Sequence, residues 1–291
     1  MKIIAFQTNR SAEGKYRIGA IRDDGRIADL THSKSSYDLG LDALLECLDL
    51  DTGFLEKARS NFSTANSFER SQIRLCAPVP RPGKVICIGL NYRDHAEESG
   101  MAIPTSPIIF SKFSGCVVAP GDPIRIPVDS EKTDYEAELA FIIGRKARNV
   151  KASDAMEYVL GYTNFNDVSA RDFQFADGQW QRGKSCETFA PMGEFIATKD
   201  EVADPHNLRI CFRLNGNTLQ DSTTDQLIFK IPELVEFLSR HITLEPGDVV
   251  ATGTPPGVGF ARKPPVFMKE GDVAEVEIEG LGVLSNPVSA S

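Results

Sequence analysis

The sequence predicts a strand-rich α+β fold. Short apolar runs with strand-like alternation dominate most of the 291 residues. The segment LRICFRLNGNTLQ, residues 208–220, has Asn-Gly at its centre, which is typical of a tight antiparallel hairpin. Helical patterns do not alternate one for one with strands, so a parallel βαβ series is not expected.

The N-terminal quarter of the chain has its own organisation. Residues 2–30 suggest a meander, in which KIIAF and YRIGAI are strand-like and DDGR forms a turn. Residues 39–61 have the apolar spacing of helices. The stretch LCAPVPRPGK that ends this region contains three prolines and one glycine, which indicates a boundary. We therefore expect a small N-terminal domain over residues 1–74 and a second domain over residues 75–291.

The second region begins with an apolar strand, KVICIGL, followed by NYRDHAEESG, a short polar helix or turn closed by Gly100. The segment IPELVEFLSRHI reads as an amphipathic helix with Pro232 in its first turn. Further strands are expected at 107–113 and 123–127, and a strand pair is expected at 270–284. A helix that runs into a strand is expected at 154–163, and a strand followed by a Gly/Pro loop at 245–259.

Composition limits the partners and the compartment. The net charge of −9 argues against a nucleic acid partner, and the apolar runs are too short to cross a bilayer. The N-terminus, MKIIAFQTNR, lacks a long apolar segment and is expected to be a first strand. The cytoplasm is the expected location, with the mitochondrial matrix as the alternative if a presequence has been removed.

The residues that commonly bind soft metals are scarce. The four histidines form no close pair, and the cysteines form no CxxC pair, so the cysteines are expected to be reduced, mostly buried thiols. A metal would therefore be held mainly by oxygen atoms, which favours Mg²⁺ or Mn²⁺ over Zn²⁺. The cysteines are Cys47, Cys76, Cys87, Cys116, Cys186 and Cys211.

The segment DYEAELAFIIG places Asp134, Glu136 and Glu138 at alternate positions before an apolar run. Alternate residues of a strand share a face. One interpretation is a half-exposed strand with a hydrated acidic face. The other is a face turned inward onto a cation, because like charges in a row repel one another and are costly to bury unpaired.

Two further clusters could carry chemistry. Asp167 follows an apolar strand; it is either a helix N-cap or a third oxygen ligand beside the two glutamates. His95 and Glu98 are three residues apart on an expected helical turn, which permits contact. They form either a surface pair or a general base in which the carboxylate orients the imidazole.

The loop TGTPPGVG, residues 252–259, has backbone N–H groups that could bind an anion or a developing oxyanion. It matches neither a P-loop nor GxGxxG. Lys184, in QRGKSCETF, is a candidate partner for a substrate carboxylate, although most lysines are simply solvated.

Taken in order, five motifs resemble the fumarylacetoacetate hydrolase family: IGLNYRDHAEESG, DYEAELAFIIG, NDVSARDFQ, GKSCETFAPMG and GDVVATGTPPGVG. They cover roughly residues 80–284, and the match is closest to members with a small N-terminal domain. The resemblance implies a mixed β-roll catalytic domain, a homodimer and one Mg²⁺ or Mn²⁺ ion. It assigns the metal ligands to Glu136, Glu138 and Asp167, catalysis to His95, Glu98 and Lys184, and substrate binding to Arg171, Gln174, Gly253 and Thr254.

The resemblance also implies a small 2-oxo acid substrate. The expected reaction is hydrolysis of a C–C bond in a 2,4-dioxo acid, with a metal-bound enolate as the product that leaves and His95 activating water. The alternatives on the same site are oxaloacetate decarboxylation and keto–enol tautomerisation. A catalytically inactive scaffold is disfavoured, because every position of the catalytic pattern is filled.

Overall fold

The computed structural model describes residues 1–35, 37–176 and 178–291. Its strands are β1 (Lys2–Thr8), β2 (Arg17–Ile21), β3 (Ile27–Asp29), β4 (Ser67–Phe68), β5 (Ile73–Cys76), β6 (Val85–Gly89), β7 (Ile108–Lys112), β8 (Val117–Val118), β9 (Ile124–Ile126), β10 (Thr133–Asp134), β11 (Ala137–Ile143), β12 (Val159–Asn166), β13 (Ser169–Ala170), β14 (Ala190–Pro191), β15 (Ile196–Thr198), β16 (Arg209–Leu214), β17 (Asn217–Thr223), β18 (Val249–Ala251), β19 (Val273–Ile278) and β20 (Gly282–Ala290). Its α-helices are α1 (Leu41–Cys47), α2 (Phe54–Asn61), α3 (Arg93–Glu98), α4 (Arg171–Gln174), α5 (Gln181–Lys184) and α6 (Ile231–His241). The strand-rich α+β class predicted from the sequence is confirmed.

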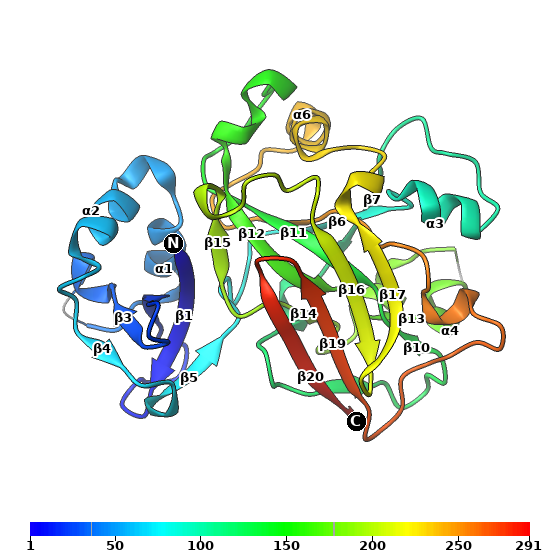
Figure 1. Ribbon diagram of the computed structural model, residues 1–291, viewed down its shortest axis with the longest axis horizontal. Coiled ribbons are helices and arrows are strands. Elements are labelled where there is room, and N and C mark those ends of the chain that lie inside the picture. The colour runs from blue at the N-terminus through cyan, green and yellow to red at the C-terminus, as the bar shows by residue number, and fades with distance from the viewer. Residues whose placement is uncertain (36, 177) are drawn as a thin grey trace.

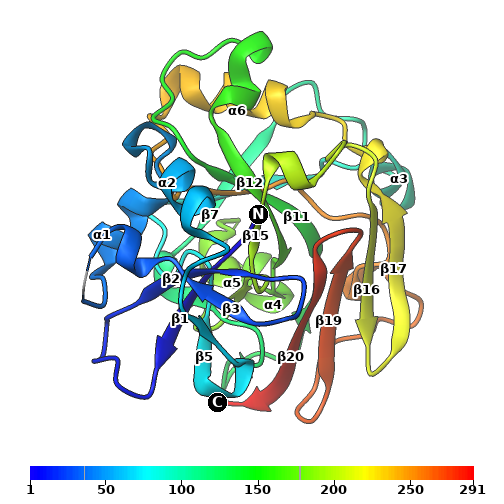
Figure 2. The same ribbon diagram turned by 60° about the vertical axis from the view of Figure 1, so that its left-hand side comes forward.

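A long mixed sheet runs through the molecule in the order β4-β3-β2-β1-β15-β12-β11-β18-β6-β7, and β5 also pairs with β1 (Figure 1). The N-terminal elements lie at one end of this sheet, on the left in Figure 1. They are joined to the rest by antiparallel pairing of β1 with β15, where Lys2 faces Ala197. The turned view in Figure 2 shows helices α1 and α2 beside the N-terminal strands.

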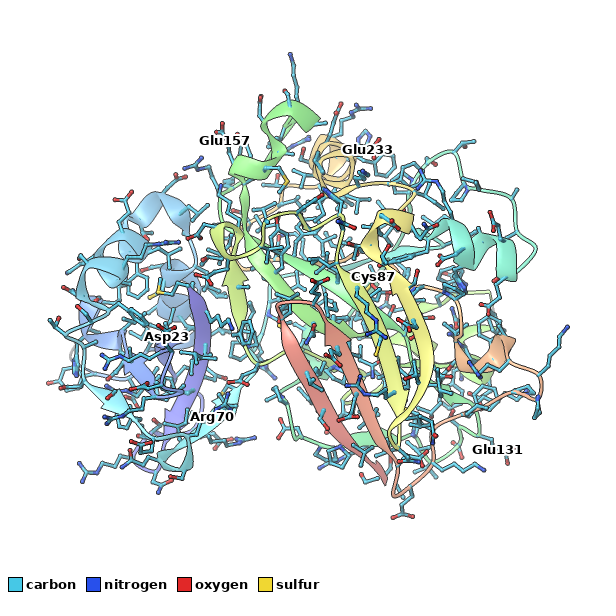
Figure 3. The ribbon with its side chains drawn as sticks, in the orientation of Figure 1. Asp23, Arg70, Cys87, Glu131, Glu157 and Glu233 are labelled. Atoms are coloured by element: carbon cyan, nitrogen blue, oxygen red, sulfur yellow. The ribbon has the colours of Figure 1, made fainter. Side chains whose placement is uncertain are left out.

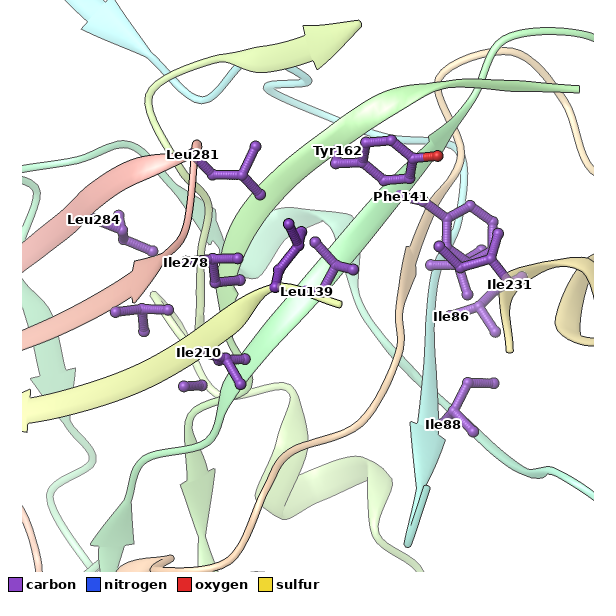
Figure 4. Packing of buried hydrophobic residues seen from close by; sticks show 14 of the residues in the cluster. Ile86, Ile88, Leu139, Phe141, Tyr162, Ile210, Ile231, Ile278, Leu281 and Leu284 are labelled. Atoms are coloured by element: carbon purple, nitrogen blue, oxygen red, sulfur yellow. The ribbon is translucent and has the colours of Figure 1, made fainter. Parts of the chain in front are cut away.

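A second sheet, in the order β17-β16-β19-β20-β9, packs against the central strands. Its β16–β17 hairpin turns at Asn215 and Gly216, both with positive φ, as expected for the Asn-Gly turn. The core between the sheets is apolar, and it includes Leu139 and Phe141 from β11 and Ile210 from β16 (Figure 4).

Strand β11 is buried on both faces. Leu139 and Phe141 point into the core between the sheets, whereas Ala140 and Ile142 belong to the cluster on the opposite side. The seven residues of β11 are all buried, and this explains why the residues that follow Glu138 in the strand are all apolar.

Among the described helices, none combines the length and the apolar character needed to span a bilayer.

The side chain of His206 binds the first residue of helix α6. The Nε2 atom of His206 accepts a hydrogen bond from the N–H of Ile231, the first residue of the helix, at 3.2 Å. Burial lowers the pKa of His206 below its ordinary value of 6.5; Lys230 lowers it further, and Asp204 and Glu233 oppose the shift. The neutral imidazole is therefore favoured in the folded state.

We predict that this histidine makes stability depend on pH. A lowered folded-state pKa means that the unfolded chain binds more protons, so the stabilisation is complete above about pH 6.5 and is lost as the pH falls below it. His206→Gln keeps an acceptor but does not titrate. Wild type should therefore exceed the variant in unfolding free energy at about pH 8, and this difference should shrink as the pH falls to about 5.5. Urea denaturation measures both values. His32→Gln, at an exposed histidine, is the control; an equal pH dependence in all three proteins would contradict the prediction.

Candidate metal centre and catalytic residues

The pairing of two strands brings three carboxylates together. Strands β11 and β12 are antiparallel, and Glu138 near the start of β11 faces Phe165 near the end of β12. The N–H of Asp167, just beyond β12, donates to the carbonyl of Glu136 at 2.9 Å. One carboxylate oxygen from each of Glu136, Glu138 and Asp167 lies within 4.8 Å of the others, and all three residues are buried.

The third acid of the alternating segment has a different role. Asp134 ends the separate short strand β10 and lies outside the carboxylate cluster, so the prediction that one strand face carries all three acids is wrong. The carboxylate of Asp134 accepts hydrogen bonds from Arg171 Nε at 2.8 Å and from the N–H of Gly259 at 2.7 Å. The alternative of a hydrated acidic face is also wrong, because even Glu136, the most exposed of the acids, has only 8% of its surface accessible.

Basic side chains surround two of the three carboxylates. Lys184 Nζ bridges Glu136 Oε2 at 2.7 Å and Asp167 Oδ2 at 2.9 Å. Arg171 Nη2 lies 2.7 Å from Glu136 Oε1. Lys184 is therefore a buried member of the cluster, and the alternative of a solvated lysine is wrong.

Sequence reasoning missed a second buried lysine, Lys112. Its Nζ donates to Asp167 Oδ1 at 2.6 Å and to the carbonyl of Val168 at 2.9 Å. Lys112 ends the apolar segment PIIFSK, and a lysine at the end of a strand usually lies in solvent. The sequence pattern alone therefore does not indicate that it is buried. Asp167 also does not cap a helix, because the N-cap of α4 is Ala170.

The two glutamates have opposite pKa shifts. Burial acts to raise the pKa of Glu136, but the charges of Lys184 and Arg171 outweigh it and lower that pKa. Burial raises the pKa of Glu138 well above its ordinary value, and the charges of Asp167 and Glu136 add to the effect. Within the described residues, Glu138 has no ion pair with a basic side chain, and its carboxylate accepts the N–H of Gly253 at 2.8 Å.

This donor set fits a divalent metal ion. Four carboxylates, counting Asp134, face three basic groups, so one negative charge is uncompensated when all are ionised. Glu138 is the carboxylate that lacks a cationic partner, and a cation next to it would favour its ionised form, against the burial and the neighbouring acids that raise its pKa. Carboxylate oxygens are ligands that Mg²⁺ and Mn²⁺ prefer.

His95 and Glu98 lie on the short helix α3. The Nδ1 atom of His95 lies 3.4 Å from Glu98 Oε2, so the predicted contact is present. The His95 side chain is largely buried, at 11% exposure, whereas that of Glu98 is 33% exposed. His95 is thus enclosed, whereas Glu98 stays accessible to solvent.

The loop after β18 binds carboxylates of the chain itself. The N–H of Gly253 donates to Glu138, and that of Gly257 lies 3.1 Å from both carboxylate oxygens of Glu98. Both glycines have positive φ, and a Cβ atom on Gly257 would lie 2.1 Å from the carbonyl oxygen of Leu219. The loop therefore connects the carboxylate cluster to the His95–Glu98 pair, and the N–H of Gly253 is already used by a protein group.

The remaining predicted residues lie nearby and are buried. Arg171 Nη1 donates to Gln174 Oε1 at 2.9 Å. Gln220 Nε2 donates to Thr254 Oγ1 at 2.8 Å, a contact that sequence reasoning missed because Gln220 belongs to the distant hairpin.

Known proteins resemble the chain over its whole length. A family model described as fumarylacetoacetate (FAA) hydrolase C-terminal matches residues 84–289. A Xenopus laevis protein named oxaloacetate tautomerase fahd2, mitochondrial, is 48% identical over 293 residues, covering 99% of this chain and 90% of that protein.

Solved structures agree with this relationship. The fumarylacetoacetate hydrolase from psychrophilic Exiguobacterium antarcticum is 38% identical, with a TM-score of 0.84 and full coverage of both chains. Maleylpyruvate hydrolase from Sphingobium sp. SYK-6, in complex with manganese (II) ion and pyruvate, is 28% identical, with a TM-score of 0.83 and full coverage of both chains. The chain therefore belongs to the fumarylacetoacetate hydrolase family.

Proposed function

We propose that the chain uses a divalent metal ion to catalyse keto–enol tautomerisation of oxaloacetate or a closely related 2-oxo acid. The buried cluster of Glu136, Glu138 and Asp167, connected by one loop to the His95–Glu98 pair, carries this proposal. The sequence predicts C–C hydrolysis, with oxaloacetate decarboxylation and keto–enol tautomerisation as the two alternatives. The name of the Xenopus relative favours tautomerisation.

The metal would supply a Lewis acid that stabilises an enolate oxygen. Glu136, Glu138 and Asp167 would hold it, and the manganese (II) ion in the Sphingobium complex supports manganese as one such ion. Lys184, paired with two of these ligands, would add positive charge near the substrate carboxylate. The three basic groups would then leave the loaded centre positively charged, which suits an anionic 2-oxo acid.

His95 would transfer the proton. Its Nδ1 faces Glu98, which leaves Nε2 to exchange a proton with the carbon next to the 2-oxo group. In ketonisation that carbon gains one proton and the enol oxygen loses one. Thr254 Oγ1 accepts its hydrogen bond from Gln220, so its own hydroxyl proton is left for a substrate oxygen.

Hydrolysis of a C–C bond in a 2,4-dioxo acid is the second candidate. The same His95–Glu98 pair could activate water, and the Sphingobium neighbour is named a hydrolase. Oxaloacetate decarboxylation is a third reaction that this site could support, because it requires the enolate but no attacking water.

Activity should require a divalent cation. Removal of metal with EDTA should abolish turnover, and Mg²⁺ or Mn²⁺ should restore it. Glu138→Gln should weaken Mn²⁺ binding by at least about 100-fold, the upper end of the loss expected for an outer-shell partner, because it removes a ligand charge. Glu97→Gln, at an exposed neighbour of the catalytic pair, should leave Mn²⁺ affinity unchanged. Full turnover in a verified metal-free preparation would refute this requirement.

His95→Ala should separate the three reactions. Loss of an acid–base group typically costs about 10²–10⁴ in rate. Ketonisation of enol-oxaloacetate should fall by at least about a hundredfold, while Mn²⁺ affinity stays unchanged because no ligand is lost. Loss of acylpyruvate cleavage instead would favour the hydrolase, and a small effect on CO₂ release from oxaloacetate would favour the decarboxylase. An unaltered ketonisation rate would rule out the role given to His95; His32→Ala is the exposed control.

We also propose a homodimer. The family resemblance supports it, and β7 lies at the end of the long sheet with Ile109 41% exposed, as an edge that a second chain could cover. Light scattering at micromolar concentration should give twice the chain mass of 31.9 kDa. A stable monomer would contradict the proposal.

The domain division and the compartment also remain proposals. A boundary between residues 74 and 75 is supported by the start of the family match at residue 84, and folding of residues 75–291 expressed alone would test it. The mitochondrial name of the Xenopus relative supports a mitochondrial location rather than the cytoplasm, which microscopy of the tagged natural protein would decide.

A further inference from the structure

Two exposed phenylalanine rings meet beside the carboxylate cluster. Phe175 directly follows helix α4, and Phe260 lies in the Gly/Pro loop after β18. Their ring centroids are 5.9 Å apart with an interplanar angle of 63°, which is an edge-to-face contact. Despite this contact, Phe175 is 58% exposed and Phe260 is 38% exposed. A single exposed apolar side chain needs no explanation, but two that touch form a patch, and an apolar patch beside polar groups is typical of a binding surface.

The ring of Phe260 lies one side chain away from the cluster. It covers the guanidinium of Arg171, whose Cζ atom is 4.5 Å from the ring centroid. The same guanidinium reaches Glu136 Oε1 through Nη2 at 2.7 Å. The N–H of Phe260 also donates to Asp134 Oδ2 at 3.1 Å. A single buried guanidinium therefore separates an exposed aromatic ring from a carboxylate of the proposed metal centre.

The position of Phe175 is fixed by helix α4. The N–H of Phe175 donates to the carbonyl of Arg171 at 3.1 Å. The helix is anchored in turn by Asp172, whose carboxylate accepts the N–H of Glu131, labelled in Figure 3, at 2.8 Å. The two rings are thus in place without any rearrangement of the backbone.

The rings flank the residues that are expected to bind substrate. Gln174 directly precedes Phe175, and its buried side chain accepts a hydrogen bond from Arg171. Thr254, which is also buried, lies earlier in the loop that carries Phe260. Helix α4 and the loop therefore each supply a buried polar group to the site and an exposed ring next to it.

We propose that Phe175 and Phe260 form an apolar wall that binds the substituent on carbon 3 of a 2-oxo acid, and that the substrates of this site include 2-oxo acids whose substituent is aromatic. This inference rests on the function proposed above. The carboxylate and 2-oxo oxygens of such an acid would lie at the charged centre, and its ring would lie against the wall. In ketonisation carbon 3 gains one proton and the enol oxygen loses one, so the substituent takes no part in the bond changes and acts through binding alone.

The test compares the affinities of phenylpyruvate and pyruvate. These acids share the 2-oxo acid head and differ by one phenyl group, so the ratio of their dissociation constants isolates the contribution of the wall. Calorimetry on the full chain loaded with Mn²⁺ gives both constants without an activity assay. Wild type should bind phenylpyruvate at least about tenfold more tightly than pyruvate, the lower end of the discrimination that one methylene gives in a hydrophobic pocket.

Phe175→Ala should reduce this preference by about two- to tenfold, which corresponds to the loss of one aromatic pair. The variant should also lower kcat/KM for ketonisation of enol-phenylpyruvate by a similar factor. Tyr37→Ala is the matched control, because Tyr37 is an exposed aromatic residue of the N-terminal region; its preference should equal that of wild type.

Wild type without a preference for phenylpyruvate would overturn the inference, as would an unchanged preference in both Phe175→Ala and Phe260→Ala. If these variants kept the preference but no longer dimerised in light scattering, a second chain would be the occupant of the wall and the inference would again be overturned. Wild type that ketonises neither enol-oxaloacetate nor enol-phenylpyruvate would instead refute the proposed function itself.

Discussion

The structure depends on balancing buried charge. Four carboxylates lie in a space with almost no access to water, and unpaired ionised carboxylates in such a space would cost several kcal/mol each. Lys112, Lys184 and Arg171 compensate three of them, and Glu138 is left with a backbone donor and a raised pKa. Within this cluster the acids outnumber the basic groups by one, an excess that suits it to the cation proposed above.

The Gly/Pro loop after β18 connects the buried acids to the His95–Glu98 pair. Its N–H groups bind three carboxylates in different places: Glu138 in the cluster, Glu98 beside His95, and Asp134 beside Arg171. Glycine is required at the two positive-φ positions, so the loop can approach these groups closely. A shift of this loop would therefore disturb Glu98 and Glu138 together.

The sequence predicted the parts of the fold that depend on local patterns. The Asn-Gly hairpin, the amphipathic helix from Ile231 and the apolar strand through Phe141 were all identifiable, because each has its own periodicity or turn signal. The ordered motifs led to the family and to the same three acids that cluster in the structure. The roles of Lys112 and Gln220 could not be predicted, because they arise from contacts between segments 34 to 55 residues apart. Asp134 was misjudged because alternation gives the side chain's direction only while the strand continues.

The sequence separation between the cluster and its donors has a consequence for folding. Lys184 lies 48 positions from Glu136, and the Gly253 donor lies 115 positions from Glu138. The unfolded chain therefore contains no preformed site, and a cation that binds the native state alone would shift the folding equilibrium by mass action. At a free concentration about 100 times its dissociation constant, such an ion adds about 2.7 kcal/mol to apparent stability. The cellular level of the free ion would then govern how long the folded protein persists, as well as how fast it works.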